Sequence, residues 1–507
     1  MTSAAPTSPS FQSRKGVARP AAASDSMRAA LAIRSVCAWL LFAGVLLAVC
    51  ALTNGDDLDS PMIARALVFS SPLLLLVARG HLGARSVSYP TVTLATLVLW
   101  ELGLGPSMVT SALRAPPFVY SEDAVLVGGF VFAAWWWVYA IVAGPAPAVA
   151  PTPASATSKS VSRLPYFGIV ALWAFVTAWS AFRGHLSNYD QSEFKVGGFD
   201  AAVAFFYITL TPLMPSIAVL AWHRWESATR VPFAIGLIVA AMLVLFLSGG
   251  RSQFVYALLV IVILLRPLGA PFRLLWLGAA LGTLNVLFIA LIAYRTALQD
   301  TNRAGSSFVK EVTAASSAVS AVSDPTSRAV ARVNAQDNVK SRLAYAPQYF
   351  VAVSHVLARG ANLSLTMMKA PLQVIPTVIL PNKNALADEY DLENNLQASG
   401  SYPPIDLSPS PILEWVFDFG VFIAPFGGAL FGLLARFVDG RLARSREISL
   451  ASWILLGSIA RTLQSFEGGT DGLLMGLREP LALAGFAALL AYLAKTFTMP
   501  RTSLGFQ

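Results

Sequence analysis

A histidine and an arginine with helical spacing occur in the polar stretch that begins at Arg295. His355 and Arg359 are four residues apart on a helix predicted to start near Arg342, so their side chains share one face. Histidine accepts protons near neutral pH, and an adjacent arginine can hold an anionic leaving group. The pair suits acid–base chemistry beside an anion. The alternative is a solvated pair on a surface helix.

Two carboxylates follow with the same spacing. Ser410 and Pro411 are the cap and the first residue typical of a helix start, and Glu414 and Asp418 fall on one face of its first two turns. The helix dipole favours carboxylates at this position, which is a structural reason for them. The same groups suit a general base and a ligand for sugar hydroxyls. We therefore expect Glu414 and His355 to be catalytic, and Asp418 and Arg359 to bind substrate.

Arginines at the ends of apolar segments are a second source of chemistry. Arg251 follows Gly250 in a tight predicted hairpin, and Arg295 ends another apolar segment at the same predicted level. Burying an arginine in a membrane costs at least about 2.5 kcal/mol, so such residues need a compensating interaction. A guanidinium binds phosphate in bidentate fashion, whereas snorkelling to lipid head groups is the structural alternative. With Arg342, these arginines form a predicted phosphate-binding set.

Other chemistries find little support in the sequence. The acidic run Asp388 to Glu393 carries oxygen donors that hard cations prefer, but we favour a solvated loop there. Phosphate-binding loops, dinucleotide fingerprints and zinc-binding spacings of Cys and His are absent from the sequence. We therefore expect no metal and no cofactor.

The composition indicates a membrane protein. The 507 residues are 56% hydrophobic and 12% charged, against the roughly 25% charged residues of soluble domains. The apolar runs are continuous rather than alternating, which predicts helices rather than a barrel. The net charge of +9 comes largely from arginines between these runs, where they orient the chain and meet anionic head groups, so we expect no nucleic acid partner.

The distribution of charge predicts an all-α polytopic membrane protein with about 12 transmembrane helices, both termini in the cytoplasm and one large periplasmic loop. A loop of this length is usually functional or disordered. The predicted parts are a disordered cytoplasmic tail (1–33), transmembrane helices 1–4 (34–144), a cytoplasmic Pro/Ala linker (145–165), transmembrane helices 5–9 (166–294), the periplasmic loop (295–410) and transmembrane helices 10–12 (411–500).

Small residues and prolines within the predicted helices concern packing. Gly427, Gly428 and Gly432 have the spacing of small residues at close helix contacts. Pro212 and Pro215 interrupt the helix predicted over 201–222 and indicate a kink. Arg183 and Arg461 lie near the ends of two other predicted helices and are weaker candidates of the same kind as Arg251.

Short motifs between about residues 245 and 440 carry a resemblance to a known family. They are the Gly250-Arg251 hairpin, the helix start Ser341-Arg342-Leu343, the Pro-flanked segment Ile375 to Lys383, and the stretch from Pro409-Ser410-Pro411 through Glu414 to Phe419-Gly420. This layout resembles the Wzy-type polymerases of O-antigen and oligosaccharide repeat units. The chain departs from that pattern in an Ala/Ser-rich insertion, about Ala304 to Ser327, and in a long link from Lys383 to Pro403.

The resemblance implies a GT-C-like membrane glycosyltransferase that needs no metal or cofactor. It would polymerise undecaprenyl-diphosphate-linked oligosaccharide repeat units into an O-antigen or exopolysaccharide at the periplasmic face of the bacterial inner membrane. Its partners would be the lipid-linked oligosaccharide and membrane lipid, with a chain-length regulator and a flippase as candidates. Arg251, Arg295 and Arg342 would neutralise the diphosphate leaving group, and Glu414 or His355 would activate the acceptor hydroxyl.

Two other functions are compatible with these features. An O-antigen ligase performs the same chemistry with lipid A core as the acceptor, and the sequence does not separate the two. A polysaccharide transporter or flippase usually has ionisable or broken-helix sites at mid-bilayer. Here the polar groups gather at one predicted face, and the Pro212 and Pro215 kink is the only irregularity within a predicted span.

Overall fold

The computed structural model describes residues 25–54, 63, 67–82, 87–101, 120–147, 162–183, 186, 199–225, 228–265, 268, 289–297, 308–330, 333, 345–363, 366–375, 379–398, 410–444, 448–464 and 469–498. This part of the chain is helical and contains no β-strand. The helices are α1 (Asp25–Asn54), α3 (Pro72–Ala78), α4 (Tyr89–Glu101), α6 (Glu122–Ala143), α7 (Leu164–Phe182), α8 (Phe199–Leu210), η2 (Thr211–Leu213), α9 (Met214–Arg224), α10 (Arg230–Leu247), α11 (Arg251–Leu265), α13 (Phe308–Ser323), α15 (Tyr345–Arg359), η3 (Thr366–Met368), α16 (Lys369–Val374), α17 (Lys383–Glu389), α18 (Leu392–Ala398), α19 (Pro411–Phe419), η4 (Ala424–Phe426), α20 (Gly427–Arg444), α21 (Leu450–Gln464) and α22 (Gly469–Thr498).

Four helical segments in the described residues are long and apolar enough to cross a membrane. They are Glu122–Ala143, Leu164–Phe182, Phe206–Arg224 and Arg230–Leu247. A helix needs about 20 residues to span a hydrocarbon core of about 30 Å. Shorter apolar helices, such as Gln253–Leu265 and Leu450–Thr462, accompany them. These elements agree with an all-α membrane protein.

Helix α6 packs directly against α20. An ideal Cβ on Gly428 would lie 2.2 Å from the backbone oxygen of Trp135, and one on Gly432 would lie 2.7 Å from that of Tyr139. Side chains larger than hydrogen would therefore separate the two helices. The predicted close contact through these glycines is confirmed. Because contacts advance by four residues along both chains, α6 and α20 run in the same direction.

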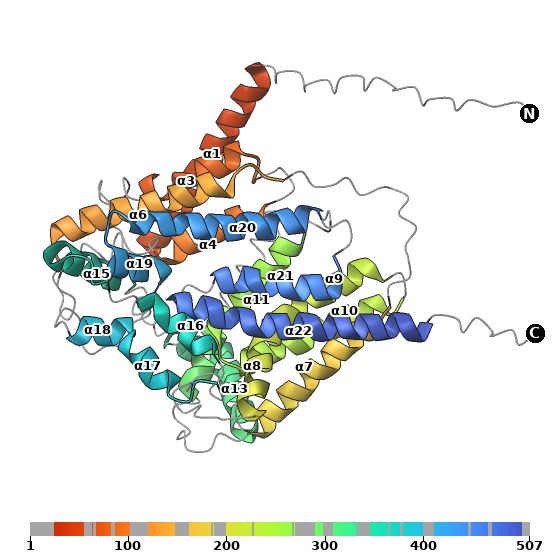
Figure 1. The fold of residues 1–507 in the computed structure, drawn as a ribbon. Helices are drawn as coiled ribbons and strands as arrows, with labels where there is room; N and C mark the ends of the chain where they lie inside the picture. Colours follow the sequence, from red (N-terminus) through yellow and green to blue (C-terminus); the bar gives the residue numbers. More distant parts are fainter. Residues whose placement is uncertain are drawn as a thin grey trace, which may run out of the picture.

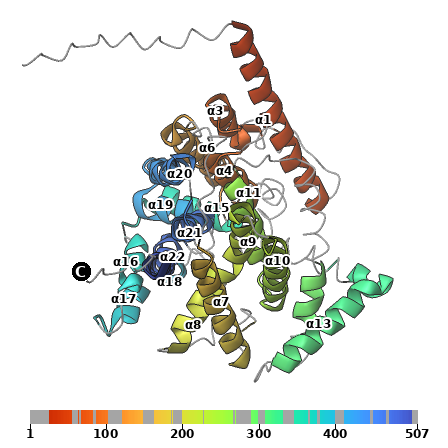
Figure 2. The same ribbon diagram turned by 90° about the vertical axis from the view of Figure 1, so that its right-hand side faces the viewer.

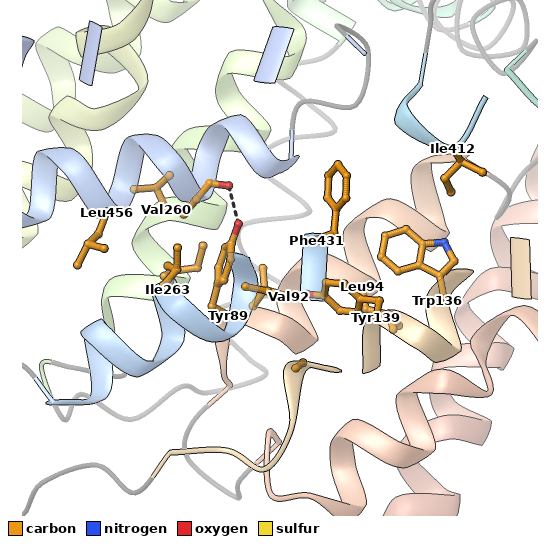
Figure 3. Close-up of a cluster of buried hydrophobic side chains, with 14 of the residues drawn as sticks. Tyr89, Val92, Leu94, Trp136, Tyr139, Val260, Ile263, Ile412, Phe431 and Leu456 are labelled. Atoms are coloured by element: carbon orange, nitrogen blue, oxygen red, sulfur yellow. Dashed lines mark hydrogen bonds between the residues drawn. The ribbon is translucent and has the colours of Figure 1, made fainter. Parts of the chain in front are cut away.

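The interior between α4, α6, α11, α20 and α21 is filled with large side chains (Figure 3). Trp136 and Tyr139 project from α6, and Phe431 comes from α20, all fully or almost fully buried. The hydroxyl of Tyr89 donates a hydrogen bond of 3.1 Å to the backbone oxygen of Ala460, which joins α4 to α21. This packed centre holds the helices that lead to the candidate site.

The predicted kink at Pro212 and Pro215 is confirmed. The helix changes to the short 3-10 segment η2 and resumes as α9 at Met214. Side chains from Thr211 to Ala218 are all buried, so the break is filled by packing. Trp453 of α21 donates to the hydroxyl of Ser216 at 2.9 Å and helps to close it.

The prediction of one continuous helix that enters the membrane from Pro411 is wrong. Helix α19 ends at Gly420, whose φ of +83° is a left-handed conformation that stops a helix. A turn and the short segment η4, which contains Pro425, precede α20. Glu414 and Asp418 therefore belong to a short helix that is separate from α20. The sequence predicted one helix because residues 411–434 are apolar on both sides of the break.

The predicted boundary of the N-terminal tail is also corrected. Helix α1 begins at Asp25, inside the segment (1–33) predicted as a disordered tail. Helix α22 begins at Gly469 and passes through Pro480. In the segment predicted as transmembrane helices 5–9, the stretch 269–288 lies outside the described residues.

The segment predicted as one loop contains helices in two separate places (Figure 2). Helix α13 packs through Ala314 and Ala318 against Tyr294. Helices α15 to α19 gather on the other side of the molecule, at one end of α6 and α22 (Figure 1). The hydroxyl of Tyr349 donates to the backbone oxygen of Gly128 at 2.9 Å, which attaches α15 to α6. The helical part that follows α13 thus caps one end of the bundle.

Candidate functional site

The pairing of α15 with α19 places three predicted site residues on two neighbouring helices. The backbone N–H of Asn362, just after α15, donates to the backbone oxygen of Phe417 at 3.0 Å. Gly420 lies close enough to Ala361 that an added Cβ would be 3.4 Å from the Cβ of that alanine. These contacts bring His355 of α15 to the same junction as Glu414 and Asp418 of α19.

His355 is held at this junction by an aromatic contact. Only 8% of the residue is exposed, and its ring lies 5.5 Å from the ring of Phe417 at an interplanar angle of 32°. Burial, followed by the positive charge of Arg359, lowers the pKa of His355 below its ordinary value of 6.5. A lowered pKa keeps the imidazole neutral near pH 7, the form that accepts a proton.

Arg359 ends α15, four residues after His355, and its side chain is exposed. The predicted helix is thus confirmed, with its described part beginning at Tyr345. The charge of Arg359 repels a protonated His355, so it lowers the pKa of His355, as burial does. Arg359 lies at the surface of the junction.

Asp418 has a positioning role in this structure. Its Oδ1 accepts hydrogen bonds from the backbone N–H of Thr366 at 2.9 Å and from the hydroxyl of the same residue at 3.0 Å. Its Oδ2 accepts from the backbone N–H of Met367 at 3.1 Å. The side chain has no exposed surface, so it fixes the start of η3 rather than contacting a substrate. Direct substrate binding by Asp418 disagrees with this burial.

Glu414 lies in the first turn of α19 and is 5% exposed. Ser410 caps the helix as predicted, because its Oγ accepts from the backbone N–H of Leu413 at 3.3 Å. The carboxylate is therefore close to the positive end of the helix dipole. This placement is compatible with both roles considered from the sequence, a dipole-stabilised acid and a general base.

A second group of predicted residues surrounds the glycine hairpin between α10 and α11. Gly249 has a φ of +69°, and a Cβ added to it would lie 3.9 Å from Nε of Arg295. The hydroxyl of Tyr294 donates to the backbone oxygen of Leu247 at 2.9 Å. These contacts place Arg295, which is partly buried, directly beside the hairpin whose next helix begins at Arg251. The backbone at Arg251 therefore lies close to Arg295, as expected from the sequence.

Arg342 lies outside the described residues. Lys383, which contributes to the family resemblance, begins α17, and its side chain also lies outside what is described.

The acidic run Asp388 to Glu393 serves the local fold. Asp391 forms an ion pair with Lys369, and its Oδ1 accepts from the backbone N–H of Asn394 at 3.0 Å, which caps α18. Asn395 donates from Nδ2 to the backbone oxygen of Asp391 at 2.7 Å. Among the described residues, no group of three or more His, Cys, Asp or Glu side chains is arranged to hold a metal ion.

Thr366 and Lys369 are structural partners that the sequence pattern did not single out. Thr366 is 52 residues from Asp418, and nothing in the local sequence marks this contact. A helix cap can be predicted from sequence because the capping residue and its partner are only about three residues apart. Long-range polar contacts of this kind require the fold itself.

A buried polar pair at the opposite end of α6 was also missed. His81 places Nε2 2.9 Å from the backbone oxygen of Gly144 and Nδ1 3.9 Å from the carboxylate of Asp439. Both side chains are about 1% exposed. Since a carbonyl can only accept, Nε2 carries a proton and donates it. This pair connects α20 to the residues after α3 and belongs to the packing of the bundle.

Comparison with known proteins adds no relative. No protein-family model matches the chain, and no curated protein or solved structure is significantly similar to it. Function must therefore be inferred from the residues and their geometry.

Proposed function

We propose that this protein is a membrane glycosyltransferase that polymerises undecaprenyl-diphosphate-linked oligosaccharide repeat units. The observation that carries the proposal is the buried His355 at the α15–α19 junction, with its lowered pKa and with Arg359 one turn away. A neutral imidazole beside an exposed guanidinium suits removal of a proton from a hydroxyl near an anion. Glu414, on the neighbouring helix, is the second candidate base.

In the proposed reaction, an acceptor sugar hydroxyl attacks the anomeric carbon of the donor. The new glycosidic C–O bond forms as the bond from that carbon to the diphosphate oxygen breaks, and the base takes the hydroxyl proton. The lipid diphosphate leaves with the electron pair, so cationic side chains stabilise its developing charge. Arg359 is the proposed cation beside His355, with Arg342 as a second, and Asp418 positions the backbone of η3. Arg251 and Arg295, at the hairpin between α10 and α11, are a separate proposed phosphate-binding set on the side of α13.

We further propose a GT-C-like arrangement of about 12 spans with α15 to α19 on the periplasmic side of the inner membrane. The parallel run of α6 and α20 supports this topology, because both are predicted to pass from the outer to the inner face. The contacts of α21 with α8 and α9 also support it, since they are antiparallel: Trp453 meets Ser216 of α9 and Arg461 meets Ile208 of α8. Both termini are then cytoplasmic.

The filled helix break at Thr211 to Leu213 favours an enzyme over a transporter. Transporters usually place their substrate site at discontinuous helices near mid-bilayer. Here the side chains around the break are buried by packing. The candidate bases instead lie at one end of the bundle.

The test is complementation in a strain that lacks this gene, followed by electrophoresis of the surface polysaccharide. Variants His355→Gln, Glu414→Gln and Arg295→Ala should lose long polymer at unchanged protein level, while Arg441→Ala on α20 should retain it. A polymerase defect leaves core bearing one repeat, whereas a ligase defect leaves bare core. Normal polymer length in all three variants would refute the site.

Transport is tested separately with purified protein in liposomes. Lipid-linked repeat units supplied on one side should yield longer glycans. Appearance of unextended donor on the opposite side, without new glycosidic bonds, would identify a flippase instead.

A further inference from the structure

A pocket of about 390 Å³ lies where the start of α7, the end of α9 and the start of α21 meet one face of α22. In Figure 1 these helix ends lie on the right of the molecule, whereas α15 to α19 lie on the left. The pocket is therefore remote from the candidate site. Its lining residues are Ser162, Pro165, Tyr166, Arg224, Ile448, Ser449, Leu450, Ala451, Ala487, Ala488 and Ala491.

Polar donors occupy one wall of the pocket. Arg224 is partly exposed and uses one Nη2 contact, a long hydrogen bond of 3.4 Å to the backbone oxygen of Ile448. A guanidinium has five N–H donors, so others remain for a ligand. None of the lining residues, all of which belong to the described part of the chain, is acidic. This wall is suited to an anion.

Tyr166 is the second donor in this wall. The residue is 2% exposed, and its ring packs against that of Trp225 with centroids 5.4 Å apart. Its phenol lies within electrostatic range of Arg224. A phenol hydroxyl that lines a pocket can donate a hydrogen bond to a ligand. The pocket contains the space for such a ligand.

Helix ends add to the positive character of this wall. Helix α21 begins at Leu450, and Ser449 caps it by accepting from the backbone N–H of Ser452 at 3.1 Å. Helix α7 begins nearby at Leu164. The first N–H groups of a helix carry partial positive charge, so both starts favour an anion between them.

The opposite wall is apolar and opens along α22. Ala487 is buried, whereas Ala488 and Ala491 are exposed beside it. The neighbouring residues on this helix are also hydrophobic. The lining of the pocket thus combines Arg224 and Tyr166 with an apolar helix face, which a free inorganic anion would not need.

We propose that this pocket binds the phosphodiester of an anionic phospholipid. Arg224 and the hydroxyl of Tyr166 donate hydrogen bonds to the phosphate oxygens, and an acyl chain follows the alanine face of α22 into the adjacent membrane leaflet. This site is independent of the proposed glycosyl transfer. The lipid would add a contact shared by α7, α9, α21 and α22.

The experiment is native mass spectrometry of the full-length protein in detergent, with equimolar phosphatidylglycerol and phosphatidylcholine of matched acyl chains. The wild type should retain phosphatidylglycerol preferentially. Tyr166→Phe and Arg224→Gln should each reduce that retention severalfold, about tenfold for the arginine because a charge-assisted bond is lost. Tyr492→Phe and Arg441→Gln, at exposed positions, are the matched controls.

The results that overturn the proposal are distinct. Equal retention of phosphatidylcholine would show an unselective apolar groove. Equal losses in the control variants would show a general effect of surface charge. Displacement of the lipid by inorganic phosphate at similar concentration would identify a soluble anion as the ligand. Tyr166→Phe removes one oxygen atom only, so a folding defect in Arg224→Gln does not prevent the test.

Discussion

Arg461 donates a hydrogen bond of 3.1 Å to the backbone oxygen of Ile208, four residues before Pro212. In a continuous helix, the N–H of residue 212 would donate to that oxygen, but proline has no N–H. The guanidinium therefore replaces a missing backbone donor, and it also lies 5.8 Å from the ring centroid of Tyr256. The charge of Arg461 thus has a structural reason inside the bundle.

Replacing Arg461 should destabilise the protein through this carbonyl. We expect Arg461→Met to lower the free energy of unfolding by about 1–3 kcal/mol, because a buried oxygen loses its donor. Thermal unfolding in detergent measures the change. Arg441→Met, at an exposed position on α20, is the control and should change stability by less than about 0.5 kcal/mol.

The hydrogen bond from Arg461 to Ile208 also predicts that substitutions at Arg461 and Pro212 have non-additive effects on stability. Pro212→Ala restores a backbone N–H that can reach Ile208, so Arg461→Met should cost less in that background. A double-mutant cycle gives the coupling, which we expect to be about 1 kcal/mol. Additive effects would mean that Arg461 acts independently of the helix break.

Asp418 and Thr366 should behave as one structural unit. Asp418→Asn loses an acceptor for the N–H of Thr366 or Met367, and Thr366→Val removes one hydroxyl from the same oxygens. Each change should cost about 1–3 kcal/mol of stability, with polymer formation falling in parallel. Polymer analysis and thermal unfolding on the same preparations check this. Loss of polymer in Asp418→Asn at unchanged stability would instead indicate substrate contact.

The pH dependence of the α15–α19 junction follows from His355. Its pKa is lowered in the folded state, so the unfolded state binds more protons at pH values just below 6.5. Stability should therefore decrease as pH falls through this range toward the folded pKa. Protection of α15 amides from hydrogen exchange measures it, and His355→Phe should remove this part of the slope. If His355 is the base, polymerisation falls only as the pH approaches the folded-state pKa of His355, at the lower end of this range.

Gly428 and Gly440 on α20 provide a matched pair for the helix contact. An added Cβ at Gly428 would lie 2.2 Å from a backbone oxygen of α6, while at Gly440 nothing lies within 4 Å. Gly428→Ala should destabilise the protein by about 1–3 kcal/mol or more through forced separation of the helices. Gly440→Ala should be neutral or stabilising by up to about 1 kcal/mol, because alanine favours helix. Thermal unfolding of both variants distinguishes packing from helix propensity.

The length of the apolar runs predicted helices, and the spacing of glycines predicted close contacts between helices. Helix α6 ends at Ala143, next to the predicted end of transmembrane helices 1–4 at position 144, and the spacing of Gly428 and Gly432 predicted the close helix packing that α6 provides. The proline break was also readable, since a missing N–H is a local property. These features depend on residues close together in sequence.

The arrangement of the candidate site depended on distant residues and on backbone conformation. Hydrophobicity continues from Pro411 to position 434, so it gave no sign of the left-handed turn at Gly420. The partner of Asp418 is Thr366, and the aromatic neighbour of His355 is Phe417. Helical spacing identified His355, Glu414 and Asp418 as candidates, but only the fold shows that Asp418 is turned inward.

The helices α15 and α19, which carry His355 and Glu414, are each connected to one member of the closely packed pair α6 and α20. Tyr349 attaches α15 to α6, and the chain of α19 continues into α20. The spacing between His355 and Glu414 is therefore set largely by the contacts of α15 and α19 with each other and with α6 and α20. The enzyme we propose could thus accommodate a bulky, growing product without losing the alignment of its reactive groups.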